Sequence, residues 1–255
     1  MRVPLLLVCV AVLLSSPGCV PSRRVHPRAA EQVRRGYAYL GADDLERAEV
    51  AFEHALAFNA EIPEALNGAA IVARRRGELR AARSLLERAL TAHSDFAEAL
   101  VNLGEVDEAE GRHDAAEERF REALAIDPDL LPARLNLARA LLHRGRRTPA
   151  RRDELWSRAR REYLHLLESD PDLAEAHHDL AFMDHEGGRL ERAAESYLRA
   201  ARADPSYADA HHGACAALAR LGRFAEADES CRACVRVAPS DARCRQSLAA
   251  VVAHP

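Results

Sequence analysis

The chain has 255 residues, of which 48% are hydrophobic and 30% are charged, so it has enough apolar material for a folded core and is not a disordered tail. Its 36 basic residues are all arginine, and with 40 acidic residues they give a formal net charge of −4. Arginines and carboxylates are interleaved along the chain instead of forming a basic patch, so we expect no nucleic-acid partner.

The first 18 residues have the pattern of a signal peptide. Arg2 precedes an apolar run from Val3 to Leu14, and small residues follow that run. The run is about 12 residues long, against the roughly 20 that a membrane-spanning helix needs. We therefore predict that residues 1–18 direct export and are then removed.

Gly18 followed by Cys19 resembles the cleavage site of bacterial lipoproteins, in which the cysteine becomes the lipidated first residue. Ser16 and Pro17 depart from that pattern, which usually has leucine and a small residue there. The alternative is ordinary signal cleavage, which would leave Cys19 a free thiol. Lipidation fits the cysteine count better, because it leaves an even number of thiols, as an oxidising compartment favours.

Val20, not aspartate, follows this cysteine, which by resemblance to bacterial sorting rules favours the outer membrane over the inner. We expect residues 19–28 to be the lipidated N-terminus and a linker, with a reach of at most about 30 Å. The folded part is then expected to lie on the periplasmic side of the outer membrane, close to its surface.

From residue 29 onward one pattern recurs with a period of about 34 residues. A small residue is followed by alanine, then by an aromatic residue or leucine, then by a second small residue and, in several copies, proline. The third copy reads Gly104, Ala116, Phe120, Ala123, Pro128, and the sixth reads Cys215, Ala227, Cys231, Cys234, Pro239. Small residues let two helices approach closely, and we expect glycines to end the first helix of the second to sixth copies: Gly77, Gly111, Gly145, Gly188 and Gly222.

This pattern resembles the tetratricopeptide repeat (TPR), a helix-turn-helix unit, across about residues 29–241. The resemblance implies an all-α fold: a right-handed α-solenoid of about six such units, each burying its apolar face against its neighbours. We expect residues 242–255 to form a capping helix at the open end. The predicted repeats are 29–62, 63–96, 97–130, 131–173 with an insertion, 174–207 and 208–241.

The insertion in the fourth repeat is rich in arginine and contains the only tryptophan, Trp156. Thr148 followed by Pro149 is a good start for the second helix of that repeat. The insertion could project as a surface for a partner or for anionic headgroups. We favour the simpler interpretation, a solvated helix end with Trp156 packed against a neighbouring hairpin.

The TPR resemblance also implies that the first helix of each repeat lines a concave groove that binds a protein segment. The groove positions are partly apolar, which suits an amphipathic helix or an extended segment, unless neighbouring repeats cover them. A clamp for a C-terminal carboxylate is not expected, because in this family it uses lysines. The predicted groove residues are Val33, Tyr37, Leu40, Ile71, Arg74, Val101, Glu105, Leu135, Arg139, Leu142, His178 and Phe182.

Histidines are concentrated in the fifth and sixth repeats, in "EAHHDLAFMDHEG" and "DAHHGAC". Equivalent positions in stacked repeats should lie about 10 Å apart, so His178, His185 and His212 could share a metal only through side-chain reach. We expect no metal and no cofactor. No catalytic motif is present, so we do not predict an enzyme, and a metal-dependent protein using these histidines is the alternative from another functional class.

Four cysteines cluster at the C-terminal end, two of them as CxxC. A haem site is excluded because Val235, not histidine, follows this motif, whereas a zinc site is possible but belongs more often to reducing compartments. In the repeat register the cysteines fall at core positions. We predict two disulfides, Cys215–Cys234 and Cys231–Cys244, with pairing inside the CxxC as second choice.

Taken together, these features predict a lipid-anchored periplasmic TPR scaffold that binds another envelope protein. A lipoprotein signal followed by six TPRs resembles the pilotin lipoproteins of type IV pilus systems, which help an outer-membrane secretin to assemble. The alternative in the same class is a scaffold of another trans-envelope machine, for secretion, gliding or cell-wall assembly.

Overall fold

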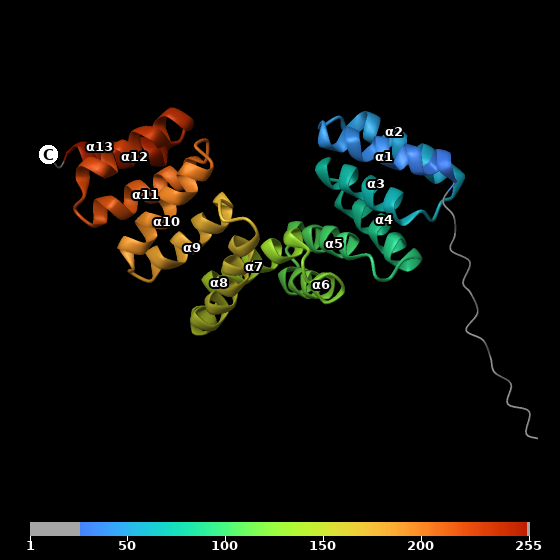
Figure 1. Cartoon of the computed structure of the whole chain (residues 1–255), viewed down its shortest axis with the longest axis horizontal. Coiled ribbons are helices and arrows are strands. Elements are labelled where there is room, and N and C mark those ends of the chain that lie inside the picture. The colour runs from blue at the N-terminus through green and yellow to red at the C-terminus, as the bar shows by residue number, and fades with distance from the viewer. Residues whose placement is uncertain (1–25, 254–255) are drawn as a thin grey trace, which may run out of the picture.

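The computed structural model describes residues 26–253 and shows an all-α solenoid bent into a U (Figure 1). The predicted signal peptide 1–18 and lipidation site Cys19 lie outside the described residues, as do residues 254–255 at the end of the predicted cap. The helices are α1 Pro27–Gly41, α2 Leu45–Phe58, α3 Pro63–Arg75, α4 Leu79–Ala92, α5 Ala97–Ala109, α6 His113–Ile126, α7 Leu131–Arg147, α8 Arg152–Ser169, α9 Ala174–Glu186, α10 Leu190–Ala203, α11 Ala208–Arg220, α12 Phe224–Val237 and α13 Ala242–Val252.

Each predicted repeat corresponds to one pair of these helices, and α13 covers the last pair; α1 begins at Pro27, however, inside the segment predicted to be a linker. Small residues on the first helix of a pair receive the large residue of the second. A methyl group added to Gly104 would come within 2.5 Å of the Phe120 ring, so only glycine fits there. Four first helices end at a glycine with positive φ, which only glycine adopts readily: Gly77, Gly111, Gly188 and Gly222.

The fourth pair is longer than the others. Helices α7 and α8 have 17 and 18 residues, whereas α5 and α6 have 13 and 14. The prediction that Gly145 ends α7 was wrong, because Gly145 lies inside the helix, where it makes room for the side chain of Trp156. The Trp156 Nε1 donates a hydrogen bond of 3.1 Å to the carbonyl oxygen of Leu142. The insertion therefore extends the hairpin with one more small-aromatic contact.

The expected start of the second helix at Thr148 was also wrong by about one turn. Pro149–Arg151 form a 3-10 turn, labelled η1, and α8 begins at Arg152. Trp156 is half-buried, as the simpler interpretation expected, and it also meets Phe182 of α9, with ring centroids 6.1 Å apart.

Ion pairs of alternating sign join consecutive repeats. The second helices of the first four repeats carry, in turn, an acidic, a basic, an acidic and a basic side chain. Each of these side chains pairs with a residue of opposite charge in the following repeat. Placing a helix pair against the wrong neighbour would bring like charges together, so these pairs favour the native order of repeats. The pairs are Glu49–Arg76 at 2.8 Å, Arg83–Glu110 at 2.8 Å, Glu117–Arg144 at 2.7 Å and Arg160–Asp184 at 2.6 Å.

The C-terminal cysteines form two disulfides, but their partners differ from the prediction: Cys215 binds Cys231 and Cys234 binds Cys244, with Cα atoms 5.2 and 5.5 Å apart. The reason lies in the packing that Gly104 and Phe120 show, in which the small position of a first helix faces the large position of its own second helix. Cys215 and Cys231 occupy those two positions. Cys234, almost one turn further along α12, faces the capping helix and reaches Cys244.

Candidate protein-binding groove

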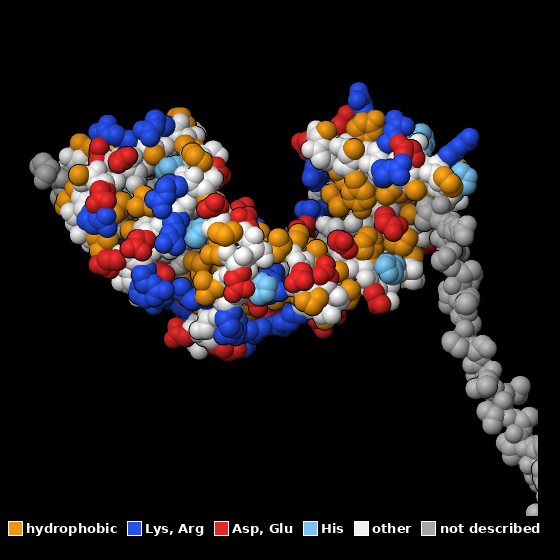
Figure 2. Space-filling view, in the orientation of Figure 1, with side chains coloured by type: hydrophobic (Ala, Val, Ile, Leu, Met, Phe, Trp, Pro, Cys, Tyr) orange, Lys and Arg blue, Asp and Glu red, His pale blue; other side chains and the backbone are white. Residues whose placement is uncertain are grey.

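On the concave side of the U, hydrophobic and charged side chains are mixed (Figure 2). The apolar floor is smaller than predicted, because neighbouring helices cover Leu40, Val101 and Leu142, which are only 6%, 5% and 4% exposed. The remaining predicted groove residues are all half-buried: Val33, Tyr37, Ile71, Arg74, Glu105, Leu135, Arg139, His178 and Phe182. The apolar surface left to a partner is therefore divided into separate side chains.

A hydrogen-bonded chain of polar side chains links the first three repeats on this face. The Tyr37 hydroxyl donates to the carbonyl oxygen of Glu64 at 2.9 Å and accepts from Nδ2 of Asn67 at 3.1 Å. Oδ1 of Asn67 in turn accepts from Nδ2 of Asn102 at 2.8 Å. Burial raises the pKa of Tyr37, so its hydroxyl remains protonated at neutral pH. These contacts fix the side chains before any partner arrives.

A second polar contact crosses from the second repeat to the fourth. Arg74 and Glu105 form an ion pair at 2.7 Å, and Nδ2 of Asn136 donates to Oε1 of Glu105 at 3.1 Å. Arg139 lies one helical turn beyond Asn136 and has no hydrogen-bond or ion-pair partner among residues 26–253. It is thus a half-buried cation on the concave face that is available to a ligand.

Aromatic and histidine side chains dominate the other half of the groove. The guanidinium of Arg146 lies 4.7 Å from the centre of the Phe182 ring. The His178 ring centroid lies 5.0 Å from that of Tyr207, and burial raises the pKa of Tyr207 to about 12. Flat, rigid side chains of this kind provide contact area with little loss of conformational entropy. This half is suited to apolar or aromatic anchors of a bound segment.

The histidines considered as metal ligands have other partners. His178 Nδ1 lies 3.0 Å from Oδ1 of Asp179, and His185 Nε2 lies 2.9 Å from Nη1 of Arg220. His212 Nε2 lies 3.2 Å from the hydroxyl of Ser247. Within residues 26–253, no three His, Cys, Asp or Glu side chains are grouped so as to hold a metal ion.

The contact between His185 and Arg220 predicts a pH dependence of stability. Burial, and next the Arg220 charge, lower the pKa of His185 below its ordinary value of 6.5, because Nε2 must stay unprotonated to accept from the guanidinium. The unfolded chain then binds more protons than the folded one. This contribution to stability is therefore complete above about pH 6.5 and decreases as the pH falls below it.

Urea unfolding at about pH 7.5 and about pH 5.5 checks this, by comparing wild type with His185→Gln, whose amide oxygen can still accept from Arg220. We expect the variant to lose less stability on acidification than wild type. Equal losses in the two proteins would show that His185 does not contribute. His54→Gln, a change at an exposed histidine of α2, is the control.

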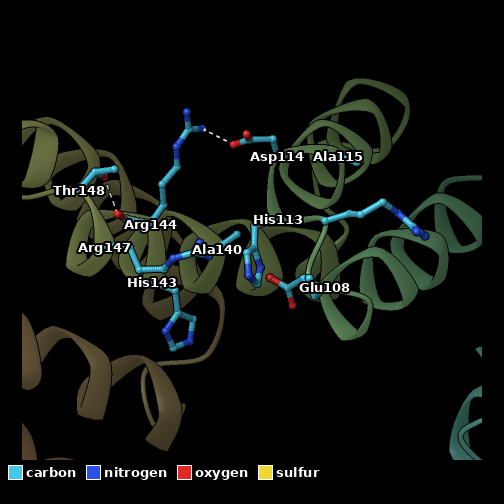
Figure 3. Close-up of a pocket in the computed structure, with 11 residues that line it drawn as sticks. Glu108, His113, Asp114, Ala115, Ala140, His143, Arg144, Arg147 and Thr148 are labelled. Carbon is cyan, nitrogen blue, oxygen red and sulfur yellow. Dashed lines mark hydrogen bonds and ion pairs between the residues drawn. The ribbon is translucent and has the colours of Figure 1, made fainter.

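A cavity of about 910 Å³ opens where the additional turn of α7 extends past the turn between α5 and α6 (Figure 3). Helix α7 lines it with Ala140, His143, Arg144 and Arg147, which recur on one face at helical spacing. The facing wall consists of Glu108 and residues 111–115. Glu108 is half-buried, and burial followed by the nearby charge of Glu105 raises its pKa.

Sequence reasoning did not identify this cavity or the roles of Asp179, Tyr207 and Arg147. The nine-residue insertion was the available signal, since added length in one repeat must place side chains where its neighbours have none. The structure brings the predicted groove residues Arg74 and Glu105 together in an ion pair. It leaves the lipidation site untested, because Cys19 lies outside residues 26–253.

None of the helices in residues 26–253 is long and apolar enough to cross a membrane.

Comparison with known proteins agrees with this geometry. Family profiles described as tetratricopeptide repeat match residues 61–129, 108–152 and 184–242. Among curated protein sequences no relative matches the chain. Many solved structures do match. The sequence identity of those named below is low, so they show similarity of fold alone.

A structure described as a functional characterisation of Pseudomonas aeruginosa pilF has a TM-score of 0.74 and 18% identity, covering 88% of this chain and 97% of its own. PilW, described as a widely conserved type IV pilus biogenesis factor, has a TM-score of 0.73 and 20% identity, covering 88% and 99%. YrrB, described as a TPR protein with an unusual peptide-binding site, has a TM-score of 0.57 and 20% identity, covering 77% and 97%.

Proposed function

Because the chain belongs to the tetratricopeptide repeat family, we propose that it is a lipid-anchored scaffold that binds another envelope protein through its concave groove, on the periplasmic side of the outer membrane. Proteins built from these repeats are generally scaffolds for protein-protein interaction without enzymatic activity, and we assign no catalytic residue. The lipid anchor would be attached at Cys19, at the end of the predicted signal peptide.

The arrangement of the concave face is the observation that carries this proposal. Its polar side chains are already bonded to one another, as in the contacts among Tyr37, Asn67 and Asn102. Arg139 forms no hydrogen bond or ion pair with any residue in 26–253, and the half-buried ring of Phe182 lies beside Arg146. A surface that is rigid before binding loses little entropy on binding, so a few free side chains can support a specific complex.

We further propose that the partner is a subunit of a trans-envelope machine, with the secretin of a type IV pilus system as the first candidate. Support comes from the combination of a predicted N-terminal lipoprotein signal with a repeat fold that covers 97% of the pilF structure and 99% of the PilW structure. A scaffold of a secretion, gliding or cell-wall machine is the alternative that the same surface would allow.

Replacing Arg139 with glutamate should reduce partner binding about tenfold, because an unpaired cation in the groove becomes an anion facing the same ligand. The measurement is the yield of photo-crosslinking from a benzoylphenylalanine placed at Ile71, in cells that express the whole chain. Arg161→Glu, an equal charge change at an exposed position of α8, is the matched control and should leave the yield unchanged. Equal yields from both variants would contradict binding through the groove.

The identity of the crosslinked protein then separates the candidates. A secretin, together with loss of secretin multimers in a strain that lacks this protein, would support the pilus assignment. A component of another machine, with normal secretin multimers, would favour the alternative. In the same strains, Cys19→Ala should move the protein from the membrane to the soluble fraction, and a variant that stays in the membrane would contradict the lipid anchor.

A further inference from the structure

The cavity beside α7 is a feature of one repeat boundary and follows from the insertion. The additional turn of α7 carries Arg144 and Arg147 past the end of α5, so these side chains overhang the α5–α6 turn. Ala140, and Ala115 on the facing wall, leave space between the helices (Figure 3). A volume of about 910 Å³ is in the range of protein sites for small ligands, and it can hold a few side chains of a peptide.

Most charged side chains around the cavity are already paired. Arg112 forms ion pairs with Asp107 at 2.8 Å and with Glu110. Arg144 binds the buried carboxylate of Glu117 at 2.7 Å and lies 3.4 Å from Asp114. These pairs neutralise most of the charge and hold the walls in place.

Two lining groups of opposite sign are left over, one on each wall. Arg147 of α7 and Glu108 of α5 form no hydrogen bond or ion pair with any residue in 26–253, and they do not pair with each other. Figure 3 shows them on opposite sides of the cavity. Two unpaired charges held apart across a cavity are complementary to a ligand that carries both signs.

We propose that this cavity binds a segment of the partner protein that carries one acidic and one basic side chain, with the acidic side chain at Arg147 and the basic one at Glu108. A cationic side chain of the ligand beside Glu108 would offset the free-energy cost of burying the Glu108 carboxylate. Within the protein, the charge of Arg139 offsets this cost only in part. His143 adds no opposing charge, since burial lowers its pKa and leaves it neutral at pH 7. His113 of α6 also lines the cavity, and the other charged lining side chains are the paired groups described above.

The inference rests on the proposed function, because the segment would belong to the same partner. Glu108 lies at the twelfth position of α5, which the predicted groove residues Arg74 and Leu142 occupy in α3 and α7, and His143 follows Leu142 directly. A segment that leaves the groove at α7 would therefore pass directly over the cavity.

Selection from a random peptide library on the purified full-length protein tests this inference. The library is first depleted on the double variant Arg147→Gln with Glu108→Gln, and the enriched peptides are measured by fluorescence anisotropy. We expect them to share one acidic and one basic residue at a common spacing. Each single variant should weaken their binding about tenfold, and replacing either charged peptide residue by glutamine should do the same.

The controls are Arg80→Gln on α4 and Glu53→Gln on α2, exposed residues that do not line the cavity. They should leave peptide binding unchanged, and thermal melts of all variants should coincide with wild type. Failure to enrich any peptide, enrichment of peptides with charges of one sign only, or equal binding to the variants would overturn the inference. Any of these results together with intact crosslinking from Ile71 would leave the groove function standing.

Discussion

Replacing Cys234 and Cys244 together with alanine should destabilise the capping helix α13 by about 3 kcal/mol, because the bridge closes a loop of 10 residues in the unfolded chain. Arg245, Gln246 and Ala249 on the outer side of α13 are exposed. The bridge joins α13 to α12, whereas α11 and α13 share two polar contacts and the apolar packing of Val251 and Leu248. The bridge is therefore expected to contribute a large part of the stability of this end.

Hydrogen exchange of the α13 amides measures this effect directly, because a solenoid can open locally at one end. Residues 242–252 should exchange about a hundredfold faster in the variant, and the amides of α3 should be unaffected. Wild type treated with a reductant should resemble the variant. Unchanged protection of α13 in both would mean that packing against α12 alone holds the cap.

Removing the carboxylate of Glu117 should lower the free energy of unfolding by about 1–3 kcal/mol, because three partly exposed guanidinium groups would lose their shared buried partner. Glu117 is only 2% exposed and pairs with Arg121 of its own helix, with Arg144 of α7 at 2.7 Å and with Arg158 of α8 at 3.6 Å. The contact therefore ties the third repeat to both helices of the extended hairpin.

The variant Glu117→Ala, compared with Glu118→Ala by urea unfolding, checks this value. Glu118 is the exposed neighbour on the same helix, and its replacement should change stability by less than about 0.5 kcal/mol. A loss below about 1 kcal/mol for Glu117→Ala would show that water replaces the carboxylate at little cost. Such a result would also weaken the argument that alternating ion pairs favour the native order of repeats.

The groove was only partly predictable from the sequence. Repeat spacing identifies which side chains point to the concave side, because every 34-residue copy places equivalent positions on the same face. It does not tell how far the neighbouring repeat extends over each position. Val101 and Leu135 occupy equivalent positions, yet the first is buried and the second half-buried, because the long fourth pair packs differently from the third.

The disulfides were likewise only partly predictable from the sequence. The number of the cysteines, their core positions and the predicted export indicate disulfides. Which cysteines pair, however, depends on the rotation of α12 about its own axis. Cys231 and Cys234 are only 3 residues apart in the sequence, yet they point to different neighbouring helices. The repeat contact of Gly104 with Phe120 contains the information needed, but it becomes visible only when the helices are packed.

The sequence by itself determined the all-α solenoid, because a single pattern of small and large residues repeats six times and local helix pairs need only their neighbours to bury an apolar face. Only the tertiary structure decided the pairing of the cysteines, the extent of the apolar groove and the cavity lined by Arg147 and Glu108, which form no ion pair within residues 26–253. These features depend on how far one helix extends past another and how it is turned, and such long-range geometry is set by the packing of whole repeats, not by the spacing of residues within one.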